Sequence, residues 1–242
     1  GTSFRINFDS IFTNADLGIY QTKKSQDIPL LSVLGYLNSK IVQYINNMLN
    51  PTVNLMPNDL KRIPFTRPSI SVEENISCLV NTCIETKKNI CAFQIINPNF
   101  TATPFQSFLD LKFENKIKSF LNYENFLTCM ILVSEAIINE QVFDIYGLSV
   151  YDKGMVLAQE GESIGGLPIS EKARDAFITE ENLTSEFPMD YIRSFIEYLP
   201  IKDFNNEERK IIEDGFPNLY RGNNNLEEFC VRNQINPINV WY

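Results

Sequence analysis

The chain has 242 residues, of which 44% are hydrophobic, and a formal net charge of −9 at pH 7. This length and hydrophobic content allow a sizeable core, arranged as one large domain or two small ones. Histidine is absent. Ser-His-Asp and Cys-His nucleophile systems, HEXXH zinc sites, two-histidine iron sites and HNH nucleases are therefore excluded for this chain alone, because all of them require imidazole.

The five cysteines predict neither a disulfide framework nor a zinc site, because their number is odd and no CxxC pair is among them. No signal peptide is evident, and Asn, Lys or Glu interrupts the longest apolar runs before the roughly 18 residues that a membrane span needs. We therefore expect a cytoplasmic protein that does not bind membranes. The chain begins without Met and ends on an apolar segment, so we expect it to be part of a longer protein.

Charge is unevenly distributed along the chain. Residues 1–118 hold 12 Lys and Arg against 9 Asp and Glu, a balance of +3, whereas residues 119–242 hold 9 against 21, a balance of −12. Contacts with nucleic-acid phosphates are made mainly by Lys and Arg. We therefore expect any DNA-facing surface in the first half and a protein-facing or solvated surface in the acidic second half.

The N-terminal segment predicts a small β module. Apolar and polar residues alternate from Phe4 to Phe8, and Asn14-Ala15-Asp16 is typical of a turn. This pattern predicts two or three short strands within residues 3–22.

The next segment carries the clearest helical pattern in the chain. Pro29 suits the first turn of a helix, and apolar residues, among them Leu37 and Ile41, recur at helical spacing until Pro51. We expect one helix over 29–49 with Leu37 and Ile41 on its buried face.

The remaining sequence is predicted to be mostly helical. Ser71 and Glu74 resemble a capping box, which predicts a helix that begins there and runs to about Ala92. We expect a second helix from Phe105 to Ile138 with a break near Asn122. The other expected elements are a short helix at 140–146, loops with one short helix over 152–188, and short helices at 189–198, 206–214 and 225–233.

The predicted fold class is α+β and mostly α, with a small N-terminal β module, a long helix and a multi-helix C-terminal region. We expect three parts, 1–68, 69–150 and 151–242. The first ends in a proline-punctuated arm whose Lys61 and Arg62 are the strongest candidates for DNA contacts. The full set of candidate DNA-binding residues is Lys40, in the helix expected over 29–49, and Lys61, Arg62 and Arg67 in the arm. The alternative is an ordinary solvated basic face.

Two motifs resemble a known family. Residues 34–65 contain Leu34-Gly35-Tyr36-Leu37-Asn38-Ser39-Lys40 and end in Ile63-Pro64-Phe65, and residues 139–148 read NEQVFDIYGL. They resemble segments that follow the target-recognition region in adenine-specific DNA methyltransferases, with the closest likeness to the BREX phage-defence enzyme of the PglX type. The resemblance covers about residues 1–150 and, more loosely, the C-terminal tail.

The resemblance implies a role in DNA recognition without catalysis. Methyltransferases of this type need a Gly-rich loop for S-adenosylmethionine and an Asn-Pro-Pro-Tyr/Phe loop for the target base. Neither occurs here, because Asn97-Pro98-Asn99-Phe100 lacks the second proline and no FxGxG sequence precedes it. We expect no catalytic, cofactor-binding or metal-binding residue in this chain, and expect S-adenosylmethionine to bind elsewhere in the parent enzyme.

Two further patterns were considered as sites. Gly161-Glu162-Ser163-Ile164-Gly165-Gly166 lacks the Lys-Ser/Thr that completes a phosphate-binding loop and is interpreted as a mobile loop. Asp110-Leu111-Lys112 and Glu208-Arg209-Lys210 match half of a PD-(D/E)xK nuclease pattern, but both lie in sequence predicted to be helical. A metal nuclease is therefore the least favoured hypothesis.

Two functions remain from the sequence. In the first, the chain is a recognition and scaffold part that binds double-stranded DNA and docks the catalytic domain of its own parent protein. In the second, it is a protein-interaction module whose acidic half docks another subunit of a defence complex. Binding that weakens steeply with salt and depends on Lys61 and Arg62 favours the first hypothesis.

Overall fold

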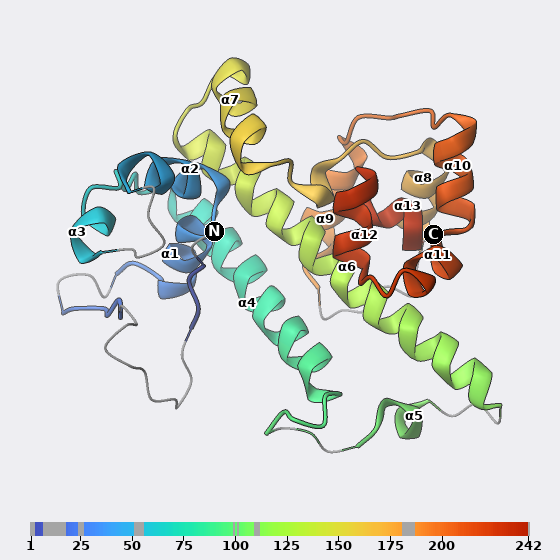
Figure 1. The fold of residues 1–242 in the computed structure, drawn as a ribbon. Coiled ribbons are helices and arrows are strands. Elements are labelled where there is room, and N and C mark those ends of the chain that lie inside the picture. Colours follow the sequence, from blue (N-terminus) through green and yellow to red (C-terminus); the bar gives the residue numbers. More distant parts are fainter. Residues whose placement is uncertain are drawn as a thin grey trace. The chain divides into compact units, whose positions relative to one another are not determined.

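The computed structural model describes residues 3–6, 18–23, 27–50, 56–98, 100, 102–108, 112–180 and 187–241 (Figure 1). The described residues are mostly helical and contain no strand; their only β-type pairing is an isolated parallel bridge between Ile169 and Ile201. The expectation of a mostly α fold is confirmed.

The predicted β module is not found in the described part of residues 3–22. Residues 3–6 and 18–22 form no strand, and residues 7–17 lie outside the described residues. A physical reason is visible at Phe4, whose backbone N–H donates to Asn38 Oδ1 at 2.9 Å and whose carbonyl accepts from Asn38 Nδ2 at 3.1 Å. An amide side chain thus satisfies the backbone groups that a neighbouring strand would otherwise pair.

Contacts divide the chain into two compact units, and each is described by itself. Unit 1 comprises residues 1–81 and 138–162, and unit 2 comprises residues 82–137 and 163–242. These boundaries differ from the expected divisions at 68 and 150, because both units draw on segments that are distant in sequence. Two long helices, α4 (Ile70–Ala92) and α6 (Phe113–Ile145), contribute residues to both units.

The predicted helix over 29–49 is two helices in unit 1. α1 (Leu30–Leu37) and α2 (Lys40–Leu49) are separated at Asn38 and Ser39, where Ser39 is extended with ψ 152°. Ser39 Oγ donates to the Tyr36 carbonyl at 2.7 Å, and such local side-chain bonds compete with helix continuation. The break changes the predicted buried face, because Ile41 is buried whereas Leu37 is only half-buried.

Unit 1 also contains α3 (Pro57–Leu60), the first part of α4, the end of α6 and α7 (Val150–Glu160), which packs against α2. Gly35 marks the closest approach of α1 to its neighbours, because a Cβ there would lie 2.8 Å from methyl groups of both Ile76 and Val80. The core of this unit is formed by Tyr36, Ile41, Val42, Ile63, Ile76, Leu79, Val80, Ile138, Val142, Phe143 and Val156.

Unit 2 is built on the end of α4, residues 113–137 of α6 and the C-terminal helices. α6 runs without the break expected near Asn122, since Asn122 is exposed and leaves the buried face of the helix intact. It also includes the separate helix expected at 140–146. The other elements are α5 (Pro104–Ser107), the 3-10 turn η1 (Ile164–Gly166), α8 (Glu171–Thr179), α9 (Met189–Glu197), α10 (Asn206–Glu213), α11 (Gly215–Arg221), α12 (Leu226–Asn233) and α13 (Pro237–Trp241).

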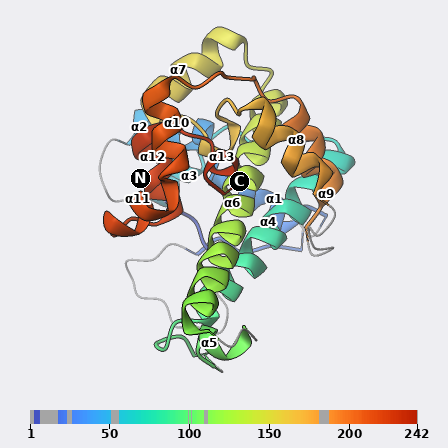
Figure 2. The same ribbon diagram turned by 90° about the vertical axis from the view of Figure 1, so that its right-hand side faces the viewer.

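The short helices of unit 2 pack in consecutive contacts that Figures 1 and 2 show from two sides: α8 lies against α9 and α13, and α13 also contacts α10 and α12. The expected helices at 189–198, 206–214 and 225–233 are confirmed as α9, α10 and α12. One short helix was expected over 152–188, whereas the described part of this range, 152–180 and 187–188, contains most of α7 and all of η1 and α8.

The glycine-rich segment expected to be a mobile loop is closely packed at its second half, Ile164–Gly166, whereas Gly161 and Glu162 are exposed. A Cβ on Gly165 would collide with the backbone of Leu132 and Val133 in α6. The buried Asn236 side chain donates to the carbonyls of Gly165 and Leu167 at 3.1 and 2.8 Å. Gly165 is therefore a packing residue of unit 2.

By length and composition α6 passes the test for a membrane-crossing helix, contrary to the sequence expectation that no segment would. However, 67% of its most apolar window is buried within the structure, and core helices of soluble proteins pass the same test.

Gly35 and Gly154 provide a matched test of the packing in unit 1. Gly35→Ala places a methyl group among buried branched side chains, so we expect it to lower the free energy of unfolding by about 1–3 kcal/mol. Gly154 lies in α7 with open space at its Cβ, so Gly154→Ala should stabilise by about 0.5–1 kcal/mol through helix propensity. Chemical denaturation of both variants measures this, and equal effects would contradict the packing described for α1.

Candidate nucleic-acid interface

The basic arm, residues 56–67, begins with a turn that is fixed to the end of α2. Asp59 Oδ2 accepts a hydrogen bond from the Met56 backbone N–H at 3.1 Å and from Asn50 Nδ2 at 2.7 Å. The Asn50 hydrogen bond is the main cause of a pKa at Asp59 below its usual value. The Asp59 side chain thus closes this turn.

Lys61 and Arg62 follow this turn directly, and both side chains are exposed. The Arg62 N–H donates to the Asp59 carbonyl at 3.0 Å, and the Ile63 N–H donates to the Leu60 carbonyl at 3.2 Å. Ile63 is 7% exposed and belongs to the core of unit 1. The two cations are thus presented on a short turn that is anchored by Asp59 before them and by Ile63 after them.

Two tyrosine hydroxyls hold the exit of the arm at Pro64. The Pro64 carbonyl accepts hydrogen bonds from Tyr36 in α1 and, at 2.7 Å, from Tyr146 at the end of α6. The two tyrosine rings stack with centroids 5.9 Å apart, and Phe65 meets the Tyr36 ring edge-on at 4.9 Å. We call Tyr36, Pro64 and Tyr146 the tyrosine latch.

Arg67 is engaged by carboxylates of unit 1. Its Nε donates to Glu73 Oε1 at 2.9 Å, and its Nη1 donates to Asp27 Oδ2 at 2.6 Å. A third bond joins Nη2 to the Asp27 carbonyl at 3.0 Å. These partners raise the pKa of Arg67, Glu73 being the largest cause, and Arg67 lowers that of Asp27. Arg67 therefore joins residue 27 to the start of α4. Its guanidinium already bonds to protein oxygens, so it is less suited to bind a phosphate than a guanidinium without such bonds.

Lys40 is also held within unit 1. Its Nζ donates to the Glu160 carbonyl at 3.1 Å, at the C-terminal end of α7, where the helix dipole favours a cation. Its backbone N–H, at the start of α2, donates to Asn139 Oδ1 at 2.8 Å. Of the four candidate residues, the structure brings only Lys61 and Arg62 together as an exposed pair.

The two sequence motifs that carry the family resemblance are joined by hydrogen bonds as well as by the stacked Tyr36 and Tyr146 rings. Asn139 caps the N–H of Lys40, and Tyr146 bonds to Pro64. These contacts join residues that are 99 and 82 positions apart in the chain. Tyr36 and Asn139 lie inside the motifs, but neither had a predicted role.

The patterns that suggested other chemistry form no site among the residues that the structure describes. Glu208 accepts from Lys202 Nζ at 2.7 Å and from the Asn205 N–H at 2.9 Å, so it caps α10. Asp110 lies outside the described residues. Among the residues that the structure describes, no group of three or more Cys, Asp or Glu side chains is placed to hold a metal ion.

Comparison with protein-family models, with curated proteins and with solved structures gives no significant match to this chain. The contacts described above are therefore the observations on which a function is proposed.

Tyr146→Phe tests the latch. Removing one half-buried hydroxyl should cost about 0.5–1.5 kcal/mol and loosen the arm. We expect trypsin to cleave after Lys61 or Arg62 faster in this variant than in the wild type. Tyr151→Phe is the control, because Tyr151 is 75% exposed in the same unit. Equal cleavage rates in all three proteins would show that the hydroxyl does not hold the arm.

The latch also predicts a pH dependence. Burial is the main cause of raised pKa values at Tyr36 and Tyr146, each with an ordinary value of 10. Folding favours the neutral hydroxyls. Their contribution to the free energy of unfolding is therefore complete below about pH 10, and it is lost as the pH rises further towards the raised pKa values. The stability difference between wild type and Tyr146→Phe should narrow above about pH 10 in denaturation experiments. A difference that stays constant up to about pH 11 would contradict this.

Proposed function

We propose that this chain is a non-catalytic recognition and scaffold part of an adenine-specific DNA methyltransferase of the BREX type, and that it contacts the DNA backbone through Lys61 and Arg62. The observation that carries the proposal is the pair of exposed cations on a turn anchored at both ends. A phosphate contact made from such a turn loses little conformational entropy, because the backbone is already ordered.

The contact between the two motifs supports the family assignment. A resemblance spread over separate segments gains weight when those segments meet through specific hydrogen bonds, as Asn139 does with Lys40 and Tyr146 with Pro64. On this proposal, unit 1 is the scaffold that carries the arm, while the catalytic domain and S-adenosylmethionine belong to another part of the parent enzyme. This piece itself is not an enzyme.

The second candidate function is docking of a partner protein through the acidic half. The balance of −12 over residues 119–242 favours it, since a strongly acidic surface repels DNA and suits a basic protein partner. The two functions use different parts of the chain. Substituting charged residues in one part at a time therefore distinguishes them, because only substitutions in the part that binds should weaken binding.

The test is the double variant Lys61→Ala with Arg62→Ala. Each lost phosphate contact should reduce the slope of log affinity against log salt by about one unit and weaken all DNA sequences similarly. We therefore expect weaker binding to duplex DNA and a slope smaller by about two, measured by fluorescence anisotropy over a range of NaCl concentrations.

The matched control is Arg209→Ala with Lys210→Ala. It removes the same charge from two adjacent exposed residues of α10 in unit 2 and should leave DNA affinity nearly unchanged. Binding that is identical in the wild type and the Lys61/Arg62 variant at every salt concentration would reject the DNA proposal and favour partner docking.

A further inference from the structure

A single side chain holds residues 3–6 on unit 1, and we call these residues the Phe4 segment. Asn38, the residue after α1, accepts the Phe4 backbone N–H with Oδ1 at 2.9 Å and donates from Nδ2 to the Phe4 carbonyl at 3.1 Å. Among the described residues, no other hydrogen bond involves the Phe4 segment. Both backbone polar groups of Phe4 are therefore satisfied by one amide side chain.

The Asn38 amide is already oriented by its own helix. A further hydrogen bond from Nδ2 goes to the Leu34 carbonyl at 3.2 Å, one turn earlier in α1. The Asn38 backbone is fixed as well, because its N–H donates to the Leu34 carbonyl at 3.1 Å and its carbonyl accepts from Gln43 Nε2 at 3.1 Å. The donor and the acceptor that meet Phe4 are thus ordered by unit 1 itself, and an ordered site loses little conformational entropy on binding.

This arrangement recognises an extended backbone. In an extended residue the N–H and the carbonyl point to the same side, so one amide can bond to both. Exposure alternates along the Phe4 segment, because Ser3 and Arg5 are exposed whereas Phe4 and Ile6 are half-buried. Proteins bind extended peptides by combining main-chain hydrogen bonds with contacts to alternate side chains. The ligand class of this site is therefore an extended peptide with apolar residues two positions apart.

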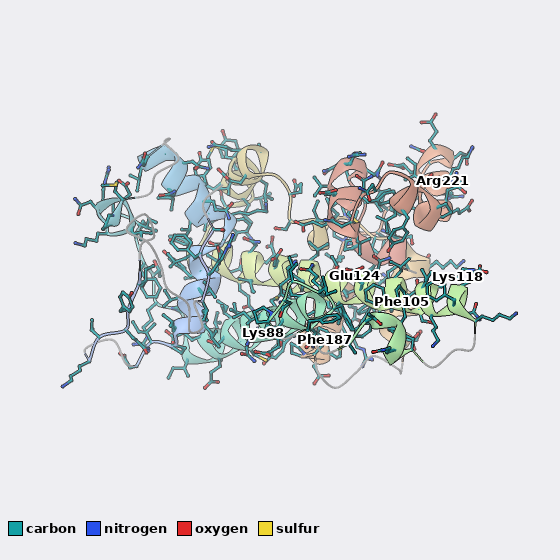
Figure 3. The ribbon with its side chains drawn as sticks, turned by 60° about the horizontal axis from the view of Figure 1, so that its bottom comes forward. Lys88, Phe105, Lys118, Glu124, Phe187 and Arg221 are labelled. Carbon is teal, nitrogen blue, oxygen red and sulfur yellow. The ribbon has the colours of Figure 1, made fainter. Side chains whose placement is uncertain are left out.

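Exposed apolar side chains elsewhere do not define a site in the same way. Ile95 and Ile96 follow α4, on which Figure 3 labels Lys88, and they are 79% and 87% exposed. No described segment covers them. The Asn38 site differs because its occupant is part of the structure, so the class of its ligand follows from observed contacts.

We propose that Asn38 is the centre of a peptide-binding site, and that the Phe4 segment of a second copy can replace the resident one. Exchange between copies repeats every contact of the resident segment, so it costs only the association itself, as in domain swapping. A segment held by two hydrogen bonds and two half-buried side chains also opens more readily than a core element does. This inference goes beyond the proposed DNA contact and does not depend on it.

The experiment uses a fluorescent peptide with the sequence of residues 1–8 and the full chain with Phe4→Ser and Ile6→Ser, the segment variant. These substitutions weaken the resident segment and leave Asn38 in place, and circular dichroism checks the fold. Fluorescence anisotropy should show saturable binding of the peptide to the segment variant. The wild type should bind it at least about tenfold more weakly, because its own segment is tethered to the site at a high effective concentration.

Loss of the amide tests the role of Asn38. Adding Asn38→Ala to the segment variant should weaken peptide binding at least about tenfold, because both main-chain hydrogen bonds are lost. The matched control is Asn47→Ala in the same variant. Asn47 is also half-buried in unit 1, but its amide donates to Glu160 Oε1, so this change should leave peptide binding nearly unchanged.

Two modified peptides test the recognition of the backbone. N-methylation of Phe4 removes the N–H that donates to Asn38 and should weaken binding at least about fivefold. N-methylation of Arg5 is the control and should have a smaller effect, because the Arg5 N–H makes no hydrogen bond in the described part of the chain. This comparison can also be made on the wild type at higher peptide concentration, so it does not depend on the folding of the segment variant.

A mixture of two full chains tests the second copy as the source of the segment. A chain with Asn38→Ala alone keeps an intact Phe4 segment without its site, and the segment variant keeps the site without an intact segment. The labelled Asn38→Ala chain should therefore bind the segment variant, while neither variant should bind to itself.

The proposal is overturned if the peptide does not bind the segment variant, if Asn38→Ala and Asn47→Ala have equal effects, or if the two methylated peptides bind equally. Peptide binding without association in the mixture would overturn the second copy as the source and would assign the site to an extended segment of another protein. No DNA is present in these measurements, so their failure leaves the test of Lys61 and Arg62 unaffected.

Discussion

The convergence of two tyrosine hydroxyls on the Pro64 carbonyl is the interaction on which the account of unit 1 depends. It connects α1, the basic arm and the end of α6 through Tyr36 and Tyr146. The carbonyl oxygen of a proline can accept two hydrogen bonds, and proline has no N–H with which to donate one. The hydrogen bonds of Pro64 are therefore made by side chains alone. Ile63, which directly precedes Pro64, is buried in the core of unit 1. The hydrogen bonds at Pro64 and the burial of Ile63 together fix the backbone that follows Lys61 and Arg62, and so fix the position of these two residues.

The same unit shows how a charged side chain can serve structure or binding according to its neighbours. Arg67 and Lys40 are bonded within the unit, Arg67 to Glu73 and Asp27, and Lys40 to the end of α7. The Arg67–Asp27 pair is exposed on both sides and contributes little to stability, whereas the Glu73 carboxylate is buried and needs the Arg67 charge beside it. The Lys40 contact is a hydrogen bond to a backbone carbonyl. All three contacts direct the guanidinium and ammonium groups towards protein partners. Lys61 and Arg62 protrude from a turn whose only local acidic residue, Asp59, already accepts from Asn50 and Met56.

The sequence predicted the helices well wherever apolar periodicity was strong and the polar residues lay on the exposed face. α9, α10 and α12 are of this kind, and α4 was also predicted although it buries Glu73, Asn75 and Thr86. It failed at Ser39, where an extended residue splits the expected helix although the apolar spacing continues, and at Asn122, where an exposed polar residue was interpreted as a break. At Ser39 a local hydrogen bond to the Tyr36 carbonyl and a distant one from the Lys40 N–H to Asn139 both favour the break. At Asn122 the side chain lies on the exposed face, so the helix continues.

The candidate site was predictable only in part. The exposed cations and the turn at Asp59 follow from local sequence, because they need neighbours a few residues away. The partners of Arg67 and Lys40, and the contact of Tyr146 with Pro64, join residues that are 40, 120 and 82 positions apart. Single-sequence patterns contain no information about such pairs, and for this reason Tyr36 and Asn139 were recognised as parts of motifs without a role.

Amide hydrogen exchange, measured on the wild-type chain with and without duplex DNA, tests the central claim most directly. If the arm lies along the DNA backbone, exchange should slow at residues 60–67 on adding DNA, while residues 187–214 of the acidic α9 and α10 region remain unchanged. Under conditions in which DNA is bound, unchanged exchange across 60–67 would contradict the account, and so would protection confined to 187–214.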